Sequence, residues 1–374
     1  MTAGSRTGRR PRAGFAGERG LGVAEMMIAM GIMVVVTGAI FQLVADGQSA
    51  FRTQPEVADV HQRLRIAADM IYKDLVAAGA GPYVGDGAGP VTNYFPAIRP
   101  GRYGALNSDP EQFFASNRLT TIHVPTTQAQ TRLAQDMGGV TEDLELDTAW
   151  AGCPPGTPCG FTNGMRGLIY DTTALGAGFD LFTVTSVGAT SVGHGGSNPS
   201  FTKVYDSLVS RVVEVKQAVY YHDTDNDQLR YYDGYETDLP LVDDVVGLTF
   251  TYFADPDPNS APKPAAGLSN CVYTADDPPA PLLQSLGGVA PKALTPAQLT
   301  DGPWCGVSPS QFDGDLLRVH KIGVAITVQV AREDLRGDDP TQFTNLGSAD
   351  SGDAWVPDYT MRFEVSPRNV NLLR

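Results

Sequence analysis

Three aspartates at alternate positions form the clearest candidate ligand pattern in the chain. Asp223, Asp225 and Asp227 stand in the stretch YHDTDNDQLRYYDG. Such spacing can direct three carboxylate oxygens at Ca²⁺, but an EF-hand loop would also need Gly at position 228 and Glu at position 234. The chain has Gln228 and Gly234 there. We favour an acidic hairpin turn between two strands, with a calcium site as the alternative, and predict no other cofactor.

A further carboxylate, Glu25, stands at the edge of a long apolar run. No charged side chain occurs from Met26 to Ala45, and about 20 apolar residues suffice to cross a bilayer as a helix. A charge at a membrane boundary costs free energy unless it reaches the headgroups or meets a cation. A secretory signal and a plain signal anchor are the simpler interpretations of a basic segment followed by an apolar run.

Four cysteines provide the remaining reactive side chains. Cys153 and Cys159 bracket the residues PPGTP, whereas Cys271 and Cys305 enclose most of a proline-rich stretch. Four cysteines allow three pairings. Local pairing, 153 with 159 and 271 with 305, is the simplest, and it would suit an oxidising periplasm or cell exterior. The tight C-x₂₋₄-C pairs typical of zinc sites are absent from the sequence.

Signals for catalysis are poor. The residues GHGGS, from Gly193 to Ser197, resemble an oxyanion loop only superficially, because no G-x-S-x-G nucleophile motif occurs in the sequence. The sequence also contains no H-E-x-x-H motif and no P-loop lysine. We therefore expect a protein that is not an enzyme.

The elements that must position these groups begin with a helix. Beyond the apolar run, Val57, Val60, Leu64, Ala67, Ile71, Leu75 and Ala78 recur at spacings of three and four, which predicts one buried face of an amphipathic helix. Gly79, Gly81 and Pro82 would end it. We expect one helix from Leu21 to Ala78, kinked at Pro55, with two separate helices joined there as the alternative.

At its N-terminus the chain resembles the class III signal of type IV pilins and type II secretion pseudopilins. In that family a basic leader ends in Gly, the mature chain starts with an apolar residue, and its fifth residue is Glu. Gly20, Leu21 and Glu25 match these positions, although Gly22-Val23-Ala24 depart from the commoner residues. The resemblance implies cleavage between Gly20 and Leu21 by a prepilin peptidase, which also N-methylates Leu21.

This resemblance gives the position of Glu25 a physical role. Cleavage would create a cation, the amine of Leu21, and the carboxylate of Glu25 could pair with the amine of an adjacent subunit inside a filament. A low dielectric strengthens that attraction, and an unpaired buried charge is penalised, so the pair would favour correct register. The simpler interpretation is that Glu25 reaches the lipid headgroups.

After Pro82 the hydrophobic period changes from helical to alternating, which predicts strands with one buried face. Expected strands span residues 118–127, 167–173, 179–187 and 208–222, the last with Val209, Val213, Val215, Val219 and Tyr221 on one face. Three more strands follow. The first is expected to bury Val246, Leu248, Phe250 and Tyr252, the second Ile322, Val324, Ile326, Val328 and Val330, and the third Tyr359, Met361, Phe363 and Val365. The predicted class is α+β, a long N-terminal pilin helix on an antiparallel sheet with long loops.

The order of these segments resembles that of PilW-type minor pilins. The helix end VHQRLRIAADMIYKDLVAAGAG, the central stretch from AVYYH to LTFTYF and the closing MRFEVSPRNVNLL carry this likeness. It implies a low-copy minor pilin that takes part in pilus assembly and contacts other minor and major pilins through its N-terminal helix. The J-type pseudopilin of type II secretion shares this order, and a membrane-anchored adhesin that never polymerises is a third possibility.

The predicted organisation follows from these segments. Residues 1–20 form the leader, 21–45 the membrane-spanning half of the helix, 46–80 its amphipathic half and 81–374 a β-rich head. Residues 254–303 contain ten prolines, too many for packed sheet, and predict a surface insertion. We expect the protein in the inner membrane with its head in the periplasm, and later in a pilus or pseudopilus, with the cell surface as a further location.

The overall charge is strongly acidic, with a formal net charge of −15. The first twenty residues contain five arginines and one glutamate, so the acidity belongs to the remainder of the chain. Binding to a nucleic-acid backbone needs clustered Lys and Arg, so no nucleic-acid partner is expected.

Overall fold

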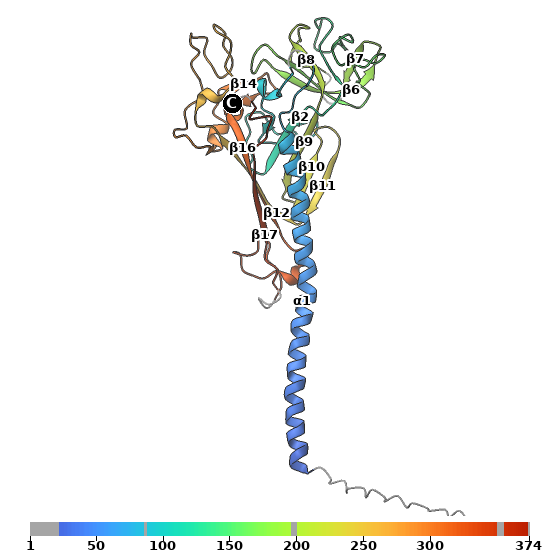
Figure 1. The fold of residues 1–374 in the computed structure, drawn as a ribbon, viewed down its shortest axis with the longest axis vertical. Coiled ribbons are helices and arrows are strands. Elements are labelled where there is room, and N and C mark those ends of the chain that lie inside the picture. Colours follow the sequence, from blue (N-terminus) through green and yellow to red (C-terminus); the bar gives the residue numbers. More distant parts are fainter. Residues whose placement is uncertain (1–21, 86–87, 196–199, 350–354, 373–374) are drawn as a thin grey trace, which may run out of the picture. The chain divides into compact units, whose positions relative to one another are not determined.

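The computed structural model describes residues 22–85, 88–195, 200–349 and 355–372. Its contacts divide the chain into two compact units, Met1–Pro55 and Glu56–Arg374. Helix α1 (Val23–Ala77) contributes residues to both units. The helix is continuous through Pro55, so the alternative of two separate helices is wrong. The predicted α+β layout, an apolar N-terminal helix and a body rich in antiparallel sheet, is confirmed (Figure 1).

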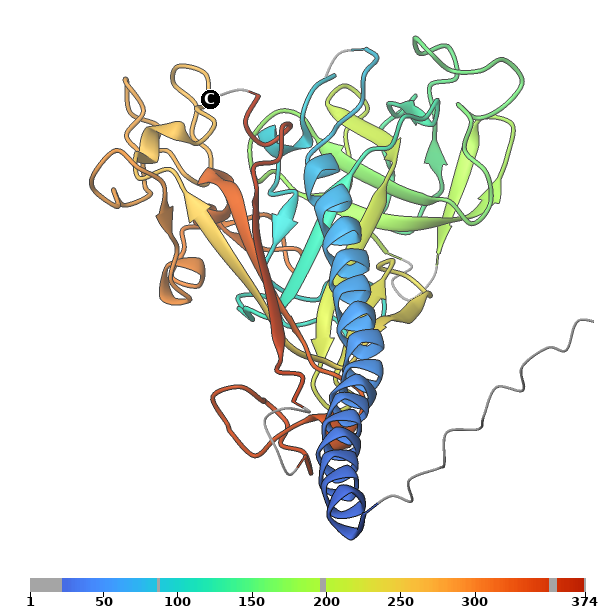
Figure 2. The same ribbon diagram turned by 60° about the horizontal axis from the view of Figure 1, so that its bottom comes forward.

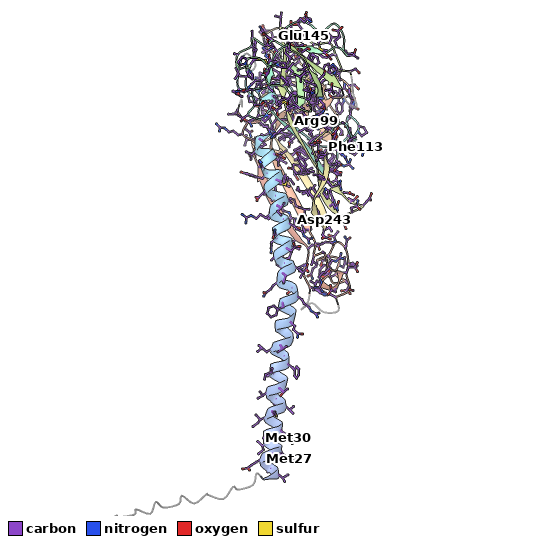
Figure 3. The ribbon with its side chains drawn as sticks, turned by 90° about the vertical axis from the view of Figure 1, so that its right-hand side faces the viewer. Met27, Met30, Arg99, Phe113, Glu145 and Asp243 are labelled. Carbon is purple, nitrogen blue, oxygen red and sulfur yellow. A yellow bond between two sulfur atoms is a disulfide. The ribbon has the colours of Figure 1, made fainter. Side chains whose placement is uncertain are left out.

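The two parts of α1 differ in what surrounds their side chains. Residues Val23–Val44 have a mean hydropathy of 2.3, and none of this apolar span is buried within the molecule. Met27 and Met30 extend freely from it (Figure 3). In the second unit the predicted face is the buried one, because Val60, Leu64, Ala67, Ile71, Leu75 and Ala78 are at most 2% exposed.

The end of α1 depends on a glycine. Gly79 has φ +80°, a conformation that L side chains disfavour, and its amide donates to the carbonyl of Ile122 at 3.0 Å. A Cβ at this position would lie 2.9 Å from a methyl group of Thr92. The chain therefore leaves the helix where the sequence predicts and passes directly into the sheet region.

Antiparallel strands make up most of the head. One sheet has the order β1-β2-β9-β10-β11, a second the order β13-β12-β16-β17, a third β3-β8-β5-β6-β7-β4, and β14 and β15 form a short pair. The first six strands are β1 (Ile98–Arg99), β2 (Arg118–His123), β3 (Gln130–Thr131), β4 (Leu144–Glu145), β5 (Arg166–Asp171) and β6 (Phe179–Val187). The next six are β7 (Ser191–Gly195), β8 (Ser210–Glu214), β9 (Lys216–Asp223), β10 (Gln228–Tyr232), β11 (Asp238–Asp243) and β12 (Val245–Ala254). The last five are β13 (Lys292–Ala293), β14 (Trp304–Cys305), β15 (Phe312–Asp313), β16 (Val319–Val328) and β17 (Tyr359–Val365).

Short 3₁₀ helices connect several of these strands. They are η1 (Val91–Asn93), η2 (Pro258–Ser260), η3 (Ala297–Leu299), η4 (Gly314–Arg318) and η5 (Glu333–Leu335). The helix η4 is buried along its length and leads directly into β16, so it joins the short β14–β15 pair to the second sheet.

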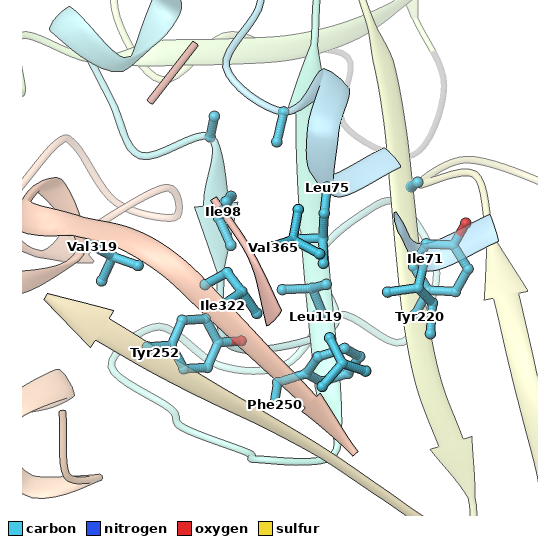
Figure 4. Close-up of a cluster of buried hydrophobic side chains, with 14 of the residues drawn as sticks. Ile71, Leu75, Ile98, Leu119, Tyr220, Phe250, Tyr252, Val319, Ile322 and Val365 are labelled. Atoms are coloured by element: carbon cyan, nitrogen blue, oxygen red, sulfur yellow. The ribbon is translucent and has the colours of Figure 1, made fainter. Parts of the chain in front are cut away.

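The main core lies between the buried face of α1 and the first two sheets. Ile71 and Leu75 of α1 face Leu119 and Tyr220 of one sheet, while Ile322 and Val365 come from the other (Figure 4). The predicted alternation in β16 is confirmed from Ile322 to Val328, whereas Gln329 and Val330 beyond the strand are both buried. In β17, Tyr359, Met361 and Phe363 are partly buried and alternate with exposed residues. Each large buried aliphatic side chain contributes about 2 kcal/mol, which makes this core the main stabilising feature of the head.

Polar contacts fix the rotation of α1 against the sheets. Arg63 donates to the carboxylate of Asp244 at 2.5 Å and also pairs with Asp59 one turn earlier. Asp244 has φ +56° and separates β11 from β12. The link therefore joins the buried helix to the point where the chain changes from the first sheet to the second.

The six-stranded sheet closes into a small barrel with its own core. The bridge Leu133↔Leu146 joins its two edges, and its interior cluster includes Ile169, Val184 and Val212. The strands β2 and β9 pair directly from Arg118↔Tyr221 to His123↔Lys216. Residues 124–215, which form the barrel, are thus an insertion between two neighbouring strands of the five-stranded sheet (Figures 1 and 2).

Several strand predictions were wrong in detail. The strand expected over 118–127 ends at His123, and the one expected over 167–173 spans Arg166–Asp171. Residues 208–222 form two strands, since the chain passes at Val215 from β8 in the barrel to β9 in the five-stranded sheet. Val245 is fully buried and Val246 only partly so, because the β12–β16 register shifts between Val245 and Gly247. Alternation alone shows neither a change of sheet nor a bulge.

Candidate functional site

The N-terminal end of α1 carries the first candidate site. Glu25 lies in the first helical turn, and its carboxylate accepts a hydrogen bond from the amide of Gly22 at 3.1 Å. An acidic side chain at this position satisfies one of the free amides of the helix and interacts favourably with the helix dipole. The carboxylate is thus held at the helix end while remaining exposed.

Behind Glu25 the helix presents apolar side chains on all sides. Val23, Met27, Ile32, Val36, Ile40 and Leu43, which lie on different faces of the helix, are each at least half exposed. A span of this length and hydropathy is compatible with membrane anchoring, and a signal sequence has the same properties. The predicted processing residues, Gly20 and Leu21, lie outside the described residues.

The cysteines are joined in the local pairing. Cys153 bonds Cys159 in the barrel, where Cys159 is fully buried, and Cys271 bonds Cys305. The second bond fastens the proline-rich insertion to strand β14, just beyond the predicted end of the insertion. Among the described residues no cysteine is free.

The aspartates at 223, 225 and 227 lie at the hairpin between β9 and β10. The carboxylate of Asp223 accepts hydrogen bonds from the amide of Asp225 at 3.2 Å and from the side chain of Asn226 at 2.9 Å. The bond from Asn226 lowers the pKa of Asp223. Asp227 has φ +49° and accepts from Asn345 at 2.8 Å. These contacts belong to the predicted acidic turn, and the calcium alternative stays a prediction.

The GHGGS segment is described as far as Gly195, the end of β7. His194 stacks on Phe201 with ring centroids 3.9 Å apart, and its Nε2 lies 2.8 Å from the carbonyl oxygen of Glu142. His194 thus packs against the barrel core through its ring and binds backbone through its nitrogen.

A group of charges that the sequence analysis missed lies at the proline-rich insertion. Oxygens of Asp301, Asp313 and Asp315 lie within 4.8 Å of one another, the only such carboxylate trio found among the described residues. Asp315 and Arg318 are at most 5% exposed and form an ion pair. The guanidinium of Arg318 therefore already supplies a positive charge beside these carboxylates, where a metal cation would otherwise have to bind. We name Asp301, Asp313, Asp315 and Arg318 the insertion charge group.

The surroundings of this group disfavour ionised carboxylates. Burial raises the pKa of Asp315 to about 7, with smaller contributions from Asp313 and Asp301, while Arg318 opposes the shift. Burial also raises the pKa of Asp313. Only the segment DGDLLR, with Asp301 twelve residues before its first aspartate, could have signalled the group, and nothing in the sequence brings these positions together.

Comparison with known proteins adds no assignment, since no protein-family model, curated protein or solved structure matches this chain. The function must be argued from the residues and geometry described above.

Proposed function

We propose that the protein is a minor pilin of a type IV pilus, a low-copy subunit of PilW type in a tip or priming complex. The observation that carries the proposal is Glu25, a single carboxylate at the start of a helix that has no charged residue from Met26 to Ala45 and is exposed on every face as far as Val44. The cost of such a side chain at a bilayer boundary is offset by a cation, with the lipid headgroups as the alternative.

Processing would supply that cation. Cleavage between Gly20 and Leu21 removes the arginine-rich segment and leaves an N-methylated amine on Leu21, four residues before Glu25. In the isolated subunit the carboxylate is satisfied by the amide of Gly22. In a filament the amine of a neighbouring subunit would replace this neutral donor, and charge-assisted bonds are about twice as strong as neutral ones.

The apolar span would then have two roles. It would hold the subunit in the inner membrane before assembly and pack against the helices of other pilins afterwards. The head argues for a low copy number on steric grounds, because a body of more than 300 residues would be difficult to repeat at each step of a tightly wound filament.

One measurement tests the processing step. Mass spectrometry of the protein from its native host should find a mature chain that begins with methylated Leu21. Recovery of a chain that retains Arg6 to Arg19, or of one trimmed beyond the apolar span, would overturn the proposal.

Replacement of Glu25 tests assembly. We expect E25A to remain in the membrane but to be lost from sheared filaments, whereas D69A, which removes an exposed acid farther along the same helix, should assemble normally. Normal assembly of E25A would instead favour an anchored adhesin that does not polymerise. Labelling along whole filaments rather than at their ends would defeat the low-copy part of the proposal.

The J-type pseudopilin of type II secretion shares these features. Deletion of the gene separates the two systems, since loss of surface pili with normal export of enzymes supports the pilus, and the reverse result supports type II secretion.

A further inference from the structure

The insertion charge group lies where the proline-rich insertion meets the rest of the head. Asp301 lies near the end of the insertion just after η3, Asp313 ends β15, and Asp315 and Arg318 belong to η4. Asp301, Asp315 and Arg318 border a cavity of about 720 Å³, which Lys292 of β13 also lines. The group therefore joins three segments of the chain, the stretch after η3, β15 and η4.

Hydrogen bonds and an ion pair of this group hold the proline-rich insertion against η4. Arg318 donates from Nη1 to the carbonyl of Gln284 in the insertion at 2.6 Å, and its Nη2 pairs with Asp315. The carboxylate of Asp313 accepts from the amide of Gly302 at 2.7 Å and from that of Asp315 at 2.8 Å. Both ends of the insertion's second half are thus bound to η4 and its cap.

The charges of the group do not balance. Three carboxylates share a small volume with one buried guanidinium, and the ammonium of Lys292 is engaged by the carbonyl of Leu286 at 2.6 Å. Like charges this close resist ionising together, and burial adds to that resistance. The closed arrangement is therefore most favourable when one carboxylate holds a proton.

We propose that the insertion charge group is a pH-dependent contact that acid stabilises. It holds the proline-rich insertion closed on η4 when one carboxylate is protonated, and it lets the insertion open more readily when that proton is lost. The charged groups facing Asp315 in the described residues are Asp313, Asp301, Lys292 and Arg318. The proposal does not depend on the function proposed above, because it concerns only the head.

The direction of the effect follows from linkage. The pKa of Asp315 is about 7 in the closed form, against an ordinary value of 3.8 in an open, hydrated form. A raised pKa in the closed form gives stability that is complete below the ordinary value and is lost as the pH rises through about 7. The opening equilibrium should therefore increase with pH, by up to about tenfold per pH unit, and level off above pH 7.

Hydrogen exchange of the full chain in detergent tests this inference. Peptides covering residues 282–303 should show protection, corrected for intrinsic exchange, that falls at least about tenfold between about pH 5 and pH 7. In D315N the neutral amide should keep these peptides protected and remove the pH dependence. The matched control D276N removes an exposed carboxylate of the same insertion and should retain the wild-type profile.

A second variant guards against misfolding of D315N. In D301N one repelling charge is removed from the rim, so the pKa of Asp315 in the closed form should fall, the midpoint of the profile should move to lower pH, and the total change in protection should become smaller. The inference is overturned if protection of the wild type does not vary with pH, if D315N is less protected than wild type throughout, or if D301N leaves the midpoint in place.

Discussion

The hydroxyl of Tyr220 on β9 donates a hydrogen bond to the carboxylate of Asp74 on α1 at 2.6 Å. The two residues are 146 positions apart in the sequence, and Tyr220 is fully buried beneath the helix. This contact joins the last turns of α1 to the centre of the five-stranded sheet. Because the acceptor is a carboxylate, its loss costs more than that of a neutral pair.

Removal of this hydroxyl should weaken the head. We expect Y220F to lower the free energy of unfolding by about 2 kcal/mol, since Asp74 loses a donor while the ring still fills its place. Chemical denaturation of the full chain in detergent measures the change. The control Y72F alters an exposed tyrosine of α1, the helix that carries Asp74, and should stay within about 0.5 kcal/mol of wild type.

The two hydrophobic cores should respond separately to cavities. L146A empties part of the barrel core and I322A part of the main core, and each should cost about 2–5 kcal/mol. Hydrogen exchange should show the loss from L146A mainly in residues 129–214 and the loss from I322A mainly in β12, β16 and β17. Equal loss of protection everywhere in both variants would mean that the barrel is not a separate cooperative unit.

The two disulfides should differ in how much they contribute to the free energy of unfolding. Sequence separations of 34 for Cys271–Cys305 and 6 for Cys153–Cys159 predict about 4 and about 2 kcal/mol from the lost chain entropy. Denaturation of C271A/C305A and C153A/C159A tests the order. A larger loss for the barrel pair would show that packing of the buried Cys159, rather than chain entropy, dominates.

Alkaline pH should destabilise the head through its buried tyrosines. Burial raises the pKa of Tyr170, Tyr205, Tyr220 and Tyr252 above the ordinary value of 10. Stability is therefore complete below pH 10 and falls as the pH rises beyond it. Near-ultraviolet titration should show part of the phenolate signal appearing only with loss of circular dichroism. Full ionisation of a protein that remains folded would contradict these assignments.

Sequence reasoning succeeded where a single periodicity controls the structure. The buried face from Val60 to Ala78 follows the helical period, and β17 has the predicted bounds because its alternation is uninterrupted. The bounds of β6 were also predicted correctly, although its burial does not alternate. The local pairing of the cysteines is likewise a short-range property of the chain.

Features that depend on distant residues were not predictable. The barrel is closed by Leu133 and Leu146 and inserted between β2 and β9, and no local pattern encodes either pairing. The insertion charge group was missed for the same reason, because Asp301 reaches Asp315 only through the fold of the proline-rich segment. The bulge beside Val246 depends on the partner strand β16.

The insertion of the barrel has a kinetic consequence. His123 and Lys216 must meet across a long stretch of chain before β2 and β9 can pair, and closing such a loop as a random coil is slow. Once the barrel has formed, the chain enters and leaves it at neighbouring points. The loop that must still be closed to pair β2 with β9 is then effectively only a few residues long. Synthesis from the N-terminus completes the barrel before β9 is made, and the order in which the ribosome delivers these segments therefore suits the order in which they must fold.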